Sequence, residues 1–193
     1  FELCVNQIID SKKNPTKELY NKTKKEIQDH FSLKNVMEIP VLEKVSINVA
    51  IKATDSNKNI LSYIEKELSL IAGQKPIVSI AKKSIAGFKL RENSVIGYYV
   101  TLRNKKMYDF LDRLIYIALP RVRDFRGLPA KSFNDSYHYS FGITDQSIFL
   151  EVDLDNILRT FGMDINIVTN AKSKEQSLYL LKSLNVPINA KIN

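Results

Sequence analysis

The sequence predicts an α+β fold, in which an antiparallel or mixed sheet carries helices on one face and leaves its other face open. Stretches whose apolar residues alternate with a period of two are interspersed with stretches whose apolar residues recur every three or four positions. The strands and helices do not form regular strand–helix–strand units, so a doubly wound parallel sheet is not expected.

The pattern predicts nine elements. In chain order they are helix 16–31, strand 41–51, a helix that ends at Gly73, strands 76–81 and 95–103 around a basic loop at 82–94, helix 105–119, strands 136–143 and 163–170, and helix 172–184. Thr16, after Pro15, is the predicted N-cap of the first helix, and Pro120 is expected to end the helix at 105–119. The inward positions of the helix that ends at Gly73 and of the last helix are Ile60, Leu61, Ile64, Leu68 and Ile71, and Leu178, Leu181 and Leu184.

Strand 41–51 indicates what the open face carries. Its apolar side consists of Val45, Ile47 and Val49, and its polar side of Lys44, Ser46 and Asn48. On strand 95–103 the side chains of Tyr99, Thr101 and Arg103 share one face. Such a face can hydrogen-bond ribose and phosphate, but an ordinary solvated face has the same pattern, and alternation alone does not separate the two.

The charge is concentrated in one part of the chain. The 193 residues have a net charge of +8, and residues 82–131, with twelve basic and four acidic side chains, account for all of it. A local excess of positive charge is typical of proteins that bind polyanions, above all nucleic acids. The alternative is a charge that serves solubility alone.

Composition excludes several classes of protein. The apolar runs are too short to cross a membrane. The single cysteine, Cys4, excludes an intramolecular disulfide and a cysteine metal cluster, and His30 and His138 lack ligand spacing.

Lysine outnumbers arginine 22 to 7, which is typical of an AT-rich genome, organellar or low-GC bacterial. The chain opens with Phe1 rather than Met, so we expect it to be processed, truncated or incomplete.

Motifs for catalysis are missing, with one exception. The sequence contains no GxxxxGK[ST], GxGxxG or GxSxG. The stretch EVDLD (151–155) places three carboxylates, including those of Asp153 and Asp155, on one side of an extended strand. This arrangement could hold Mg²⁺ as in a nuclease or form a solvated strand edge, and the second interpretation is the simpler one.

The basic loop combines cations with an aromatic side chain. Gly87 and Phe88 are followed by Lys89 and Arg91. The Phe88 ring could stack on a nucleobase while the cations neutralise phosphates, or it could anchor the loop in the core.

A second basic segment, RDFRGLPAKSF (123–133), follows the helix at 105–119. Its Arg123 and Arg126, together with the preceding Arg121, form what we call the arginine loop (121–127), whose path Gly127 and Pro129 fix. Asp124 is expected to pair with one arginine, and Phe125 or Phe133 to pin the loop inward. No general base accompanies the arginines, so the loop is predicted to grip phosphate or to hold shape rather than to catalyse.

Five stretches, in order, carry a resemblance to a known family. They are IPVLEKVSINV (39–49), LIAGQKPIVSIAKKSIAGFKLRENSVIG (70–97), VTLR (100–103), LPRVRDFRGLPAKSF (119–133) and GMDINIVTNAKSKEQSLYLL (162–181). The chain thereby resembles the large-subunit ribosomal protein five family, which binds 5S rRNA in the central protuberance. The resemblance covers residues 17–188, and it implies an N-terminal extension at 1–15 and a single RNA-binding domain at 16–193.

The resemblance implies a protein without enzymatic activity or cofactor whose partners are RNAs and ribosomal proteins. The residues expected to bind 5S rRNA are Lys44, Asn48, Gln74, Lys75, Thr101 and Arg103. The loop expected to face P-site tRNA carries Lys83, Ser84, Gly87, Phe88, Lys89 and Arg91. The residues expected to grip large-subunit rRNA phosphates are Lys82, Arg121, Arg123, Arg126 and Lys131. Further expected partners are the small-subunit head protein thirteen and neighbouring central-protuberance proteins, with no membrane.

The chain departs from the family pattern at three turns. AIKATDSN follows the first strand in place of a Gly-rich turn, Asn93 replaces a glycine, and Asp135 and Tyr137 replace glycines. With the composition and the extension, these departures favour a mitochondrial ribosome over a bacterial or plastid one. The alternatives to a ribosomal role are a small basic metal-dependent nuclease that uses residues 151–155 and a free RNA chaperone.

Overall fold

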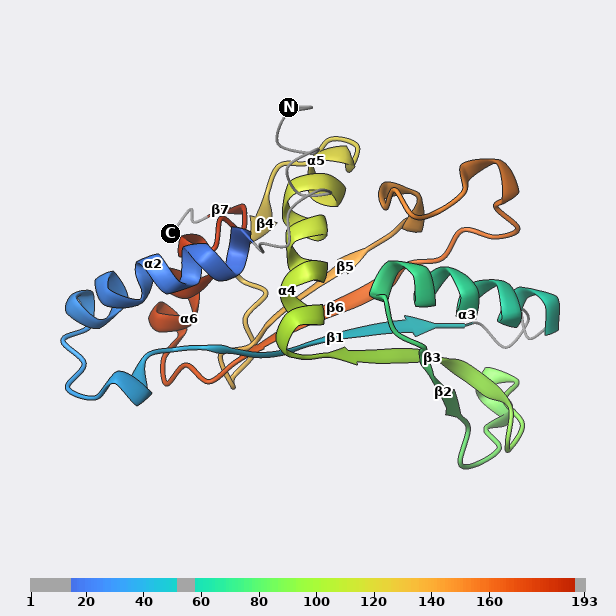
Figure 1. The fold of residues 1–193 in the computed structure, drawn as a ribbon. Coiled ribbons are helices and arrows are strands. Elements are labelled where there is room, and N and C mark those ends of the chain that lie inside the picture. Colours follow the sequence, from blue (N-terminus) through green and yellow to red (C-terminus); the bar gives the residue numbers. More distant parts are fainter. Residues whose placement is uncertain (1–14, 52–57, 190–193) are drawn as a thin grey trace.

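A five-stranded antiparallel sheet forms the centre of the molecule, with helices packed on one of its faces (Figure 1). The computed structural model describes residues 15–51 and 58–189. The strands are β1 (Leu42–Ala50), β2 (Ile77–Ile80), β3 (Val95–Leu102), β5 (Tyr139–Ile143) and β6 (Met163–Thr169), in the spatial order β2-β3-β1-β6-β5. The main helices are α2 (Pro15–His30), α3 (Lys58–Ala72), α4 (Asn104–Arg113) and α6 (Lys174–Ser183). The predicted α+β class is confirmed.

Alternate residues of the strands are apolar and face the helices, so the hydrophobic core lies between the sheet and the helices. Ile47 of β1 lies directly across from Val100 of β3 and Ile165 of β6, and all three are fully buried. Helix α3 covers these strands with Ile64, Leu68 and Ile71 and ends before Gly73, whose left-handed φ of +63° suits a residue without a Cβ. Among the described residues, no helix is both long and apolar enough to cross a membrane.

The N-terminal turn of α2 is held by a contact with α4. Thr16 lies inside the helix and is fully buried, so the prediction that it is the N-cap is wrong. Its backbone N–H and its hydroxyl both donate to the Asp112 carboxylate of α4. Asp112 therefore takes the role of a capping carboxylate from another helix, a contact that local sequence does not reveal.

Pro120 does not end the helix that precedes it, contrary to the prediction. After α4 the chain forms a π-helical turn, Leu114–Ala118, and continues as the short helix α5, Leu119–Arg121. The wider turn lies directly before Pro120, where an α-helical hydrogen bond would be missing because proline lacks an N–H. The helical path therefore extends to Arg121, at the start of the arginine loop.

The stretch 151–155 is not a strand, so the expected row of three carboxylates is wrong. Residues Leu154–Asn156 form a 3-10 helix whose N-cap is Asp153, and the Asp153 carboxylate accepts hydrogen bonds from the backbone of Asp155 and the side chain of Asn156. Glu151 pairs with Arg113 of α4. Within 15–51 and 58–189, no group of three or more potential metal ligands occurs.

Two smaller differences from the prediction concern the turn before β5 and the buried face of α6. Residues 134–137 form a turn in which Tyr137 adopts a left-handed φ of 62°, and β5 begins only at Tyr139. In α6, Leu180 is buried and the predicted Leu178 is only half-buried. The stretch AIKATDSN, which departs from the family pattern, lies largely at 52–57, outside the described residues. Most of the extension 1–15 also lies outside them.

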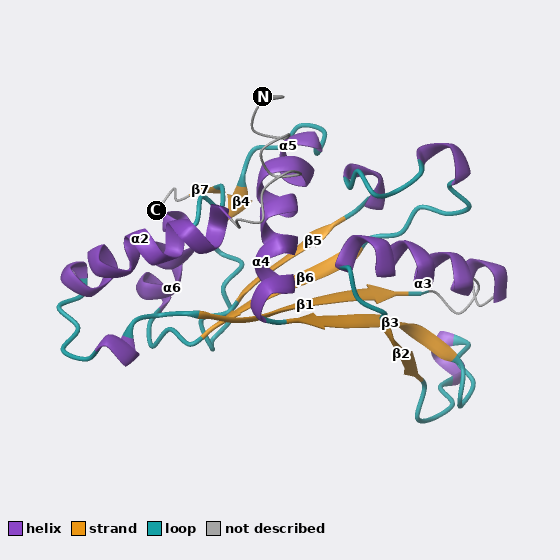
Figure 2. Cartoon of the chain, viewed as in Figure 1, coloured by secondary structure: helices purple, strands orange, loops and turns teal. Residues whose placement is uncertain are grey.

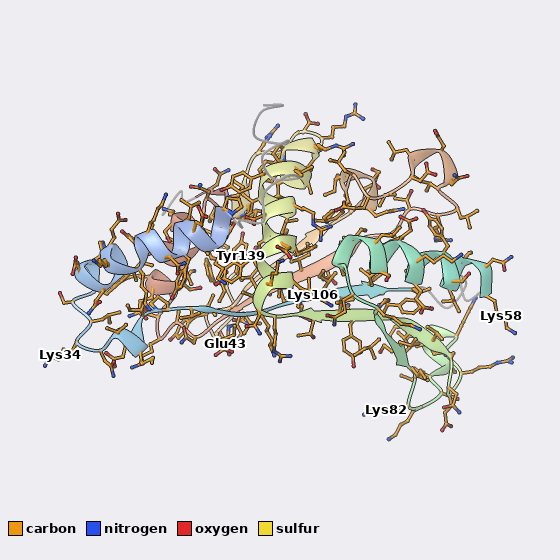
Figure 3. All side chains as sticks on the ribbon, in the orientation of Figure 1. Lys34, Glu43, Lys58, Lys82, Lys106 and Tyr139 are labelled. Atoms are coloured by element: carbon orange, nitrogen blue, oxygen red, sulfur yellow. The ribbon has the colours of Figure 1, made fainter. Side chains whose placement is uncertain are left out.

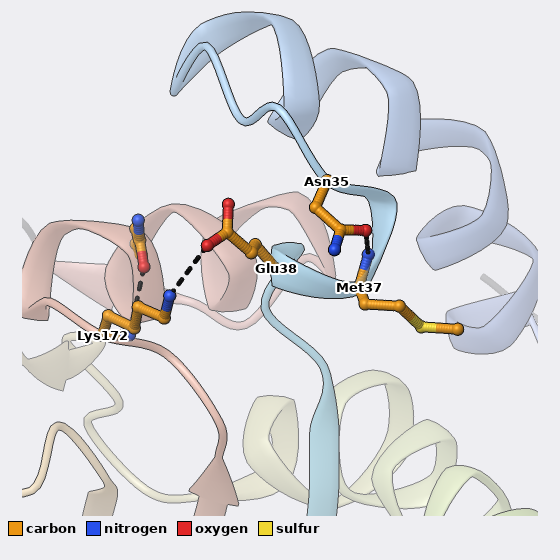
Figure 4. A network of polar contacts seen from close by, with 5 residues as sticks. Asn35, Met37, Glu38 and Lys172 are labelled. Carbon is orange, nitrogen blue, oxygen red and sulfur yellow. Dashed lines mark hydrogen bonds and ion pairs between the residues drawn. The ribbon is translucent and has the colours of Figure 1, made fainter.

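The chain before β1 is tied to the chain after β6. In the short 3-10 helix Val36–Glu38, the Asn35 side chain accepts a hydrogen bond from the Met37 N–H at 3.0 Å, and Glu38 pairs with Lys172 at 3.0 Å (Figure 4). Asn170 also accepts a hydrogen bond from the Val41 N–H at 2.6 Å. These contacts fix β1, the central strand of the sheet, against β6.

Candidate nucleic-acid interface

The helix-free side of the sheet, called the open face from here on, carries mostly small or polar side chains. Strand pairing defines its members, since residues directly across from one another share a face. They are Lys44, Ser46, Asn48 and Ala50 of β1, Ile77 and Ser79 of β2, Gly97, Tyr99 and Thr101 of β3, Ser140 and Gly142 of β5, and Asp164, Asn166 and Val168 of β6. The face offers hydrogen-bonding groups at fixed positions.

Two predicted binding residues lie close together at the centre of this face. Ser46 lies directly across from Thr101, and the next outward residue of β1 is Asn48, which lies across from Tyr99. Asn48 is exposed and Thr101 is half-buried. The prediction that Asn48 and Thr101 share the uncovered face is confirmed.

Gln74 and its neighbours form the rim of the open face beside β3. The Gln74 amide donates to the Thr101 carbonyl at 3.4 Å, and Lys106 donates to the Gln74 amide oxygen at 3.3 Å. Lys75 is exposed and pairs with Glu65 at 3.5 Å. A pair this exposed contributes little to stability, so Lys75 is available to an anionic partner at small cost.

Lys44 and Arg103 add two cations at the ends of the strands. Lys44 lies on β1 across from Val168 of β6 and is half-buried. Arg103 directly follows β3, is exposed, and precedes the first residue of α4. The predicted set of six residues is thus distributed over the open face and its rim.

The basic loop 82–94 projects from the end of the β2–β3 hairpin (Figure 2). A bridge between Ile85 and Leu90 closes it, and Asn93 adopts the left-handed conformation, φ 62°, that glycine would otherwise supply. Phe88 is 71% exposed, so it does not anchor the loop in the core. That leaves the interpretation in which its ring is free to stack.

The cations of the basic loop point into solvent. Lys82, Lys83, Lys89 and Arg91 are exposed, and none forms an ion pair with a described residue. Lys82 extends away from the body of the molecule (Figure 3). Ser84 has a structural role, because its hydroxyl accepts a hydrogen bond from the Glu92 N–H at 2.9 Å, and Gly87 has open space around it.

The arginine loop presents Arg121, Arg123 and Arg126 at its surface. All three arginines are exposed, and none of them forms an ion pair with a described residue. Asp124 therefore pairs with none of them, contrary to the prediction, and it adopts a left-handed φ of 56°. Phe125 is half-buried against the core, which confirms that an aromatic residue pins the loop.

A contact with the C-terminal part of the chain closes this loop. Strand β4 (Leu128–Pro129) pairs with β7 (Ile188–Asn189), and the Asn189 side chain donates to the Arg126 carbonyl. A Cβ at Gly127, whose φ is +91°, would lie 2.7 Å from Asn189 Cγ, so a side chain there would require the Asn189 side chain to move.

Lys131 follows the arginine loop and is exposed. The segment that carries it is held by Tyr139, whose hydroxyl donates to the Pro129 carbonyl at 3.0 Å. Burial raises the pKa of Tyr139 to about 12, so this donor stays protonated at any physiological pH.

Sequence reasoning missed the contribution of β5 and β6 to the open face. Ser140 lies across from Asn166, and Asp164 lies between Asn48 and Gly142. The signal was present, since Asp164 and Asn166 alternate with apolar residues in MDINIVT as the polar residues of β1 do. Only the strand order shows that β6 lies beside β1 and that β5 continues the same face.

Comparison with known proteins identifies the family. Residues 35–91 match the family described as "Ribosomal protein L5", and residues 95–188 match the model for the C-terminus of the same ribosomal protein family. The chain is 48% identical over 171 residues to the large ribosomal subunit protein uL5 of Geotalea daltonii, covering 88% of this chain and 96% of that protein. This chain belongs to the ribosomal protein uL5 family.

Other uL5 relatives are bacterial and plastid proteins. The uL5 protein of Clostridium botulinum strain Eklund 17B is 52% identical, with 82% of this chain and 89% of the relative covered. The uL5c protein of Gracilaria tenuistipitata var. liui is 47% identical, with 90% and 98% covered. The mitochondrial location that composition favoured finds no support in these relatives.

Membership of the uL5 family assigns the general role. The chain is a structural, non-enzymatic constituent of the large ribosomal subunit, and ribosomal RNA is its class of partner. The alternative of a metal-dependent nuclease is thereby set aside, as the capped, non-extended geometry of residues 151–155 also indicates.

Proposed function

We propose that the open face and its rim bind 5S rRNA in the central protuberance. The observation that carries this proposal is the contrast between a face of mostly neutral residues, half of them with hydrogen-bonding side chains, and its cationic surroundings on a chain of net charge +8. Neutral polar groups at fixed spacing recognise a particular RNA shape, whereas cations attract any RNA. Asn48, Gln74 and Thr101 are the recognition residues, and Lys44, Lys75 and Arg103 neutralise nearby phosphates.

The two loops take different RNA partners in this proposal. The basic loop, with Phe88 exposed at its tip beside Lys83, Lys89 and Arg91, contacts P-site tRNA. The arginine loop, with Lys82 and Lys131, grips phosphates of the large-subunit rRNA. Contacts with small-subunit protein thirteen and with neighbouring proteins complete the role in a bridge between the subunits.

The proposal is tested by titrating the chain against 5S rRNA and an unrelated structured RNA of equal length at several salt concentrations. Phosphate contacts weaken with salt for both RNAs, so the decisive quantity is the ratio of the two affinities at fixed salt. We expect a preference on the order of a hundredfold or more for 5S rRNA, reduced roughly tenfold or more when Asn48, Gln74 and Thr101 are changed to alanine. Equal binding of both RNAs by the unmodified chain would instead favour an RNA chaperone.

A further inference from the structure

A hollow lies in the open face where β1, β5 and β6 meet. Asn48, Ser140, Gly142, Asp164 and Asn166 are among the residues that line it. Asp164 is central, since it lies across from Asn48 on one side and from Gly142 on the other. Gly142 keeps the hollow open, because a Cβ there would lie only 3.3 Å from the Asp164 Oδ1 atom.

Asp164 is an unexpected residue on a surface that binds RNA. It is exposed, and its carboxylate makes no hydrogen bond or ion pair with any residue that the structure describes. A carboxylate repels phosphate, so beside the RNA backbone it would weaken binding. On this surface it gains energy from a partner that presents hydrogen-bond donors, such as the N–H groups of a base edge.

Among the nucleobases, guanine fits a carboxylate best. Its pairing edge carries two adjacent donors, N1–H and the N2 amine, which match the two oxygens of Asp164, and one acceptor, O6, beside them. The Asn48 amide, directly across from Asp164, can donate to that acceptor. The edge is accessible only when the guanine is unpaired, as in an RNA loop or bulge.

We propose that this hollow is a subsite for one unpaired guanine and that Asp164 is its specificity-determining residue. The proposal rests on the proposed binding of 5S rRNA to the open face, and it adds a base identity to it. The side chains of the hollow recognise the base edge by hydrogen bonds, while the cations around the open face bind the RNA backbone.

The decisive variant is Asp164→Asn, because the proposal and simple electrostatics predict opposite signs. If Asp164 accepts hydrogen bonds from guanine, the variant binds 5S rRNA roughly tenfold more weakly or worse, since the amide cannot accept from both donors of the base. If Asp164 only faces solvent or phosphate, removing its negative charge leaves binding unchanged or strengthens it. Asp155→Asn, an exposed aspartate in a 3-10 helix outside the open face, is the control for the change in net charge.

Two further measurements separate recognition from folding. Gly142→Val fills the hollow without changing any charge and should weaken 5S rRNA binding as Asp164→Asn does, with thermal unfolding of both variants monitored. Kethoxal, which reacts with N1 and N2 of unpaired guanines, should find one guanine of 5S rRNA protected by the unmodified chain and exposed with Asp164→Asn. Tighter or equal binding by Asp164→Asn, or an unchanged footprint, would overturn the subsite. Failure of the unmodified chain to prefer 5S rRNA would overturn the proposed function itself.

Discussion

The two faces of the sheet are built from alternate residues of the same strands and differ in almost every property. On β1, Ile47 is 0% exposed beneath the helices, and its neighbour Asn48 is exposed on the open face. The covered face is nearly all apolar, and it supplies the burial that stabilises the fold. The open face buries little apolar surface, so the side chains that stabilise the fold and those proposed to recognise RNA lie one residue apart on the same strand.

The largest expected effect comes from substituting each of these two neighbours in turn. Ile47→Ala should lower the free energy of unfolding by about 2–5 kcal/mol, because it leaves a cavity between sheet and helices. Asn48→Ala should change it by about 0.5 kcal/mol or less, as is usual for exposed sites, yet reduce the preference for 5S rRNA. Urea unfolding and RNA titration on both variants measure this. If Asn48→Ala unfolds as easily as Ile47→Ala, the two functions are not separated.

A second prediction sharpens the contrast between the open face and the basic loop. Changing Lys83, Lys89 and Arg91 to alanine should weaken binding to every RNA by a similar factor. The slope of log affinity against log salt should become shallower by about 0.7–0.9 for each phosphate that the variant no longer neutralises. Asn48→Ala should leave that slope unchanged. A loop variant that altered the ratio between two RNAs at fixed salt would show that the loop also reads sequence or shape.

The smallest effect concerns a polar group on the covered side. Glu67 of α3 is 8% exposed, and its Oε2 atom has no hydrogen-bond partner among the described residues. Burial, and then the nearby charge of Asp153, raise the pKa of the Glu67 carboxyl. Because the folded pKa lies above the unfolded one, the contribution of this group to stability is most favourable below the unfolded carboxyl pKa and falls as the pH rises through the folded value.

Glu67→Gln should therefore raise the melting temperature at pH 7, on the order of 2 °C for a chain of this size. The gain should shrink at acidic pH, where the unmodified carboxyl is protonated. Glu26→Gln, an exposed glutamate of α2, is the matched control and should leave the melting temperature unchanged at both values of pH. A gain that does not depend on pH would mean that charge burial is not the cause.

Local sequence patterns predicted most helices and strands correctly. They also predicted the part of the candidate site that β1 and β3 carry. The alternation in β1 and the 3.6-residue spacing in α3 are properties of single segments, and both were predicted correctly. The shared face of Asn48 and Thr101 followed from the same alternation on two strands. The strand predicted at 151–155 was wrong. The alternate spacing of its carboxylates fits a strand, whereas Asp153 uses its carboxylate to cap a 3-10 helix.

The remaining features depend on which segments meet in space. Asp164 joins the site only because β6 pairs with β1, and Asp112 caps α2 across 96 residues of sequence. No short-range rule specifies such contacts, so they require the three-dimensional structure.

The pairing of β4 with β7 has a consequence for the order in which the protein is made. Asn189, which holds the Arg126 carbonyl, is translated 63 residues after it. While the chain is being synthesised, the arginine loop therefore emerges before the strand that closes it. Its final shape exists only once residues 186–189 have been added and have packed beside Leu128, so a nascent chain that stops earlier carries the three arginines without the geometry that positions them.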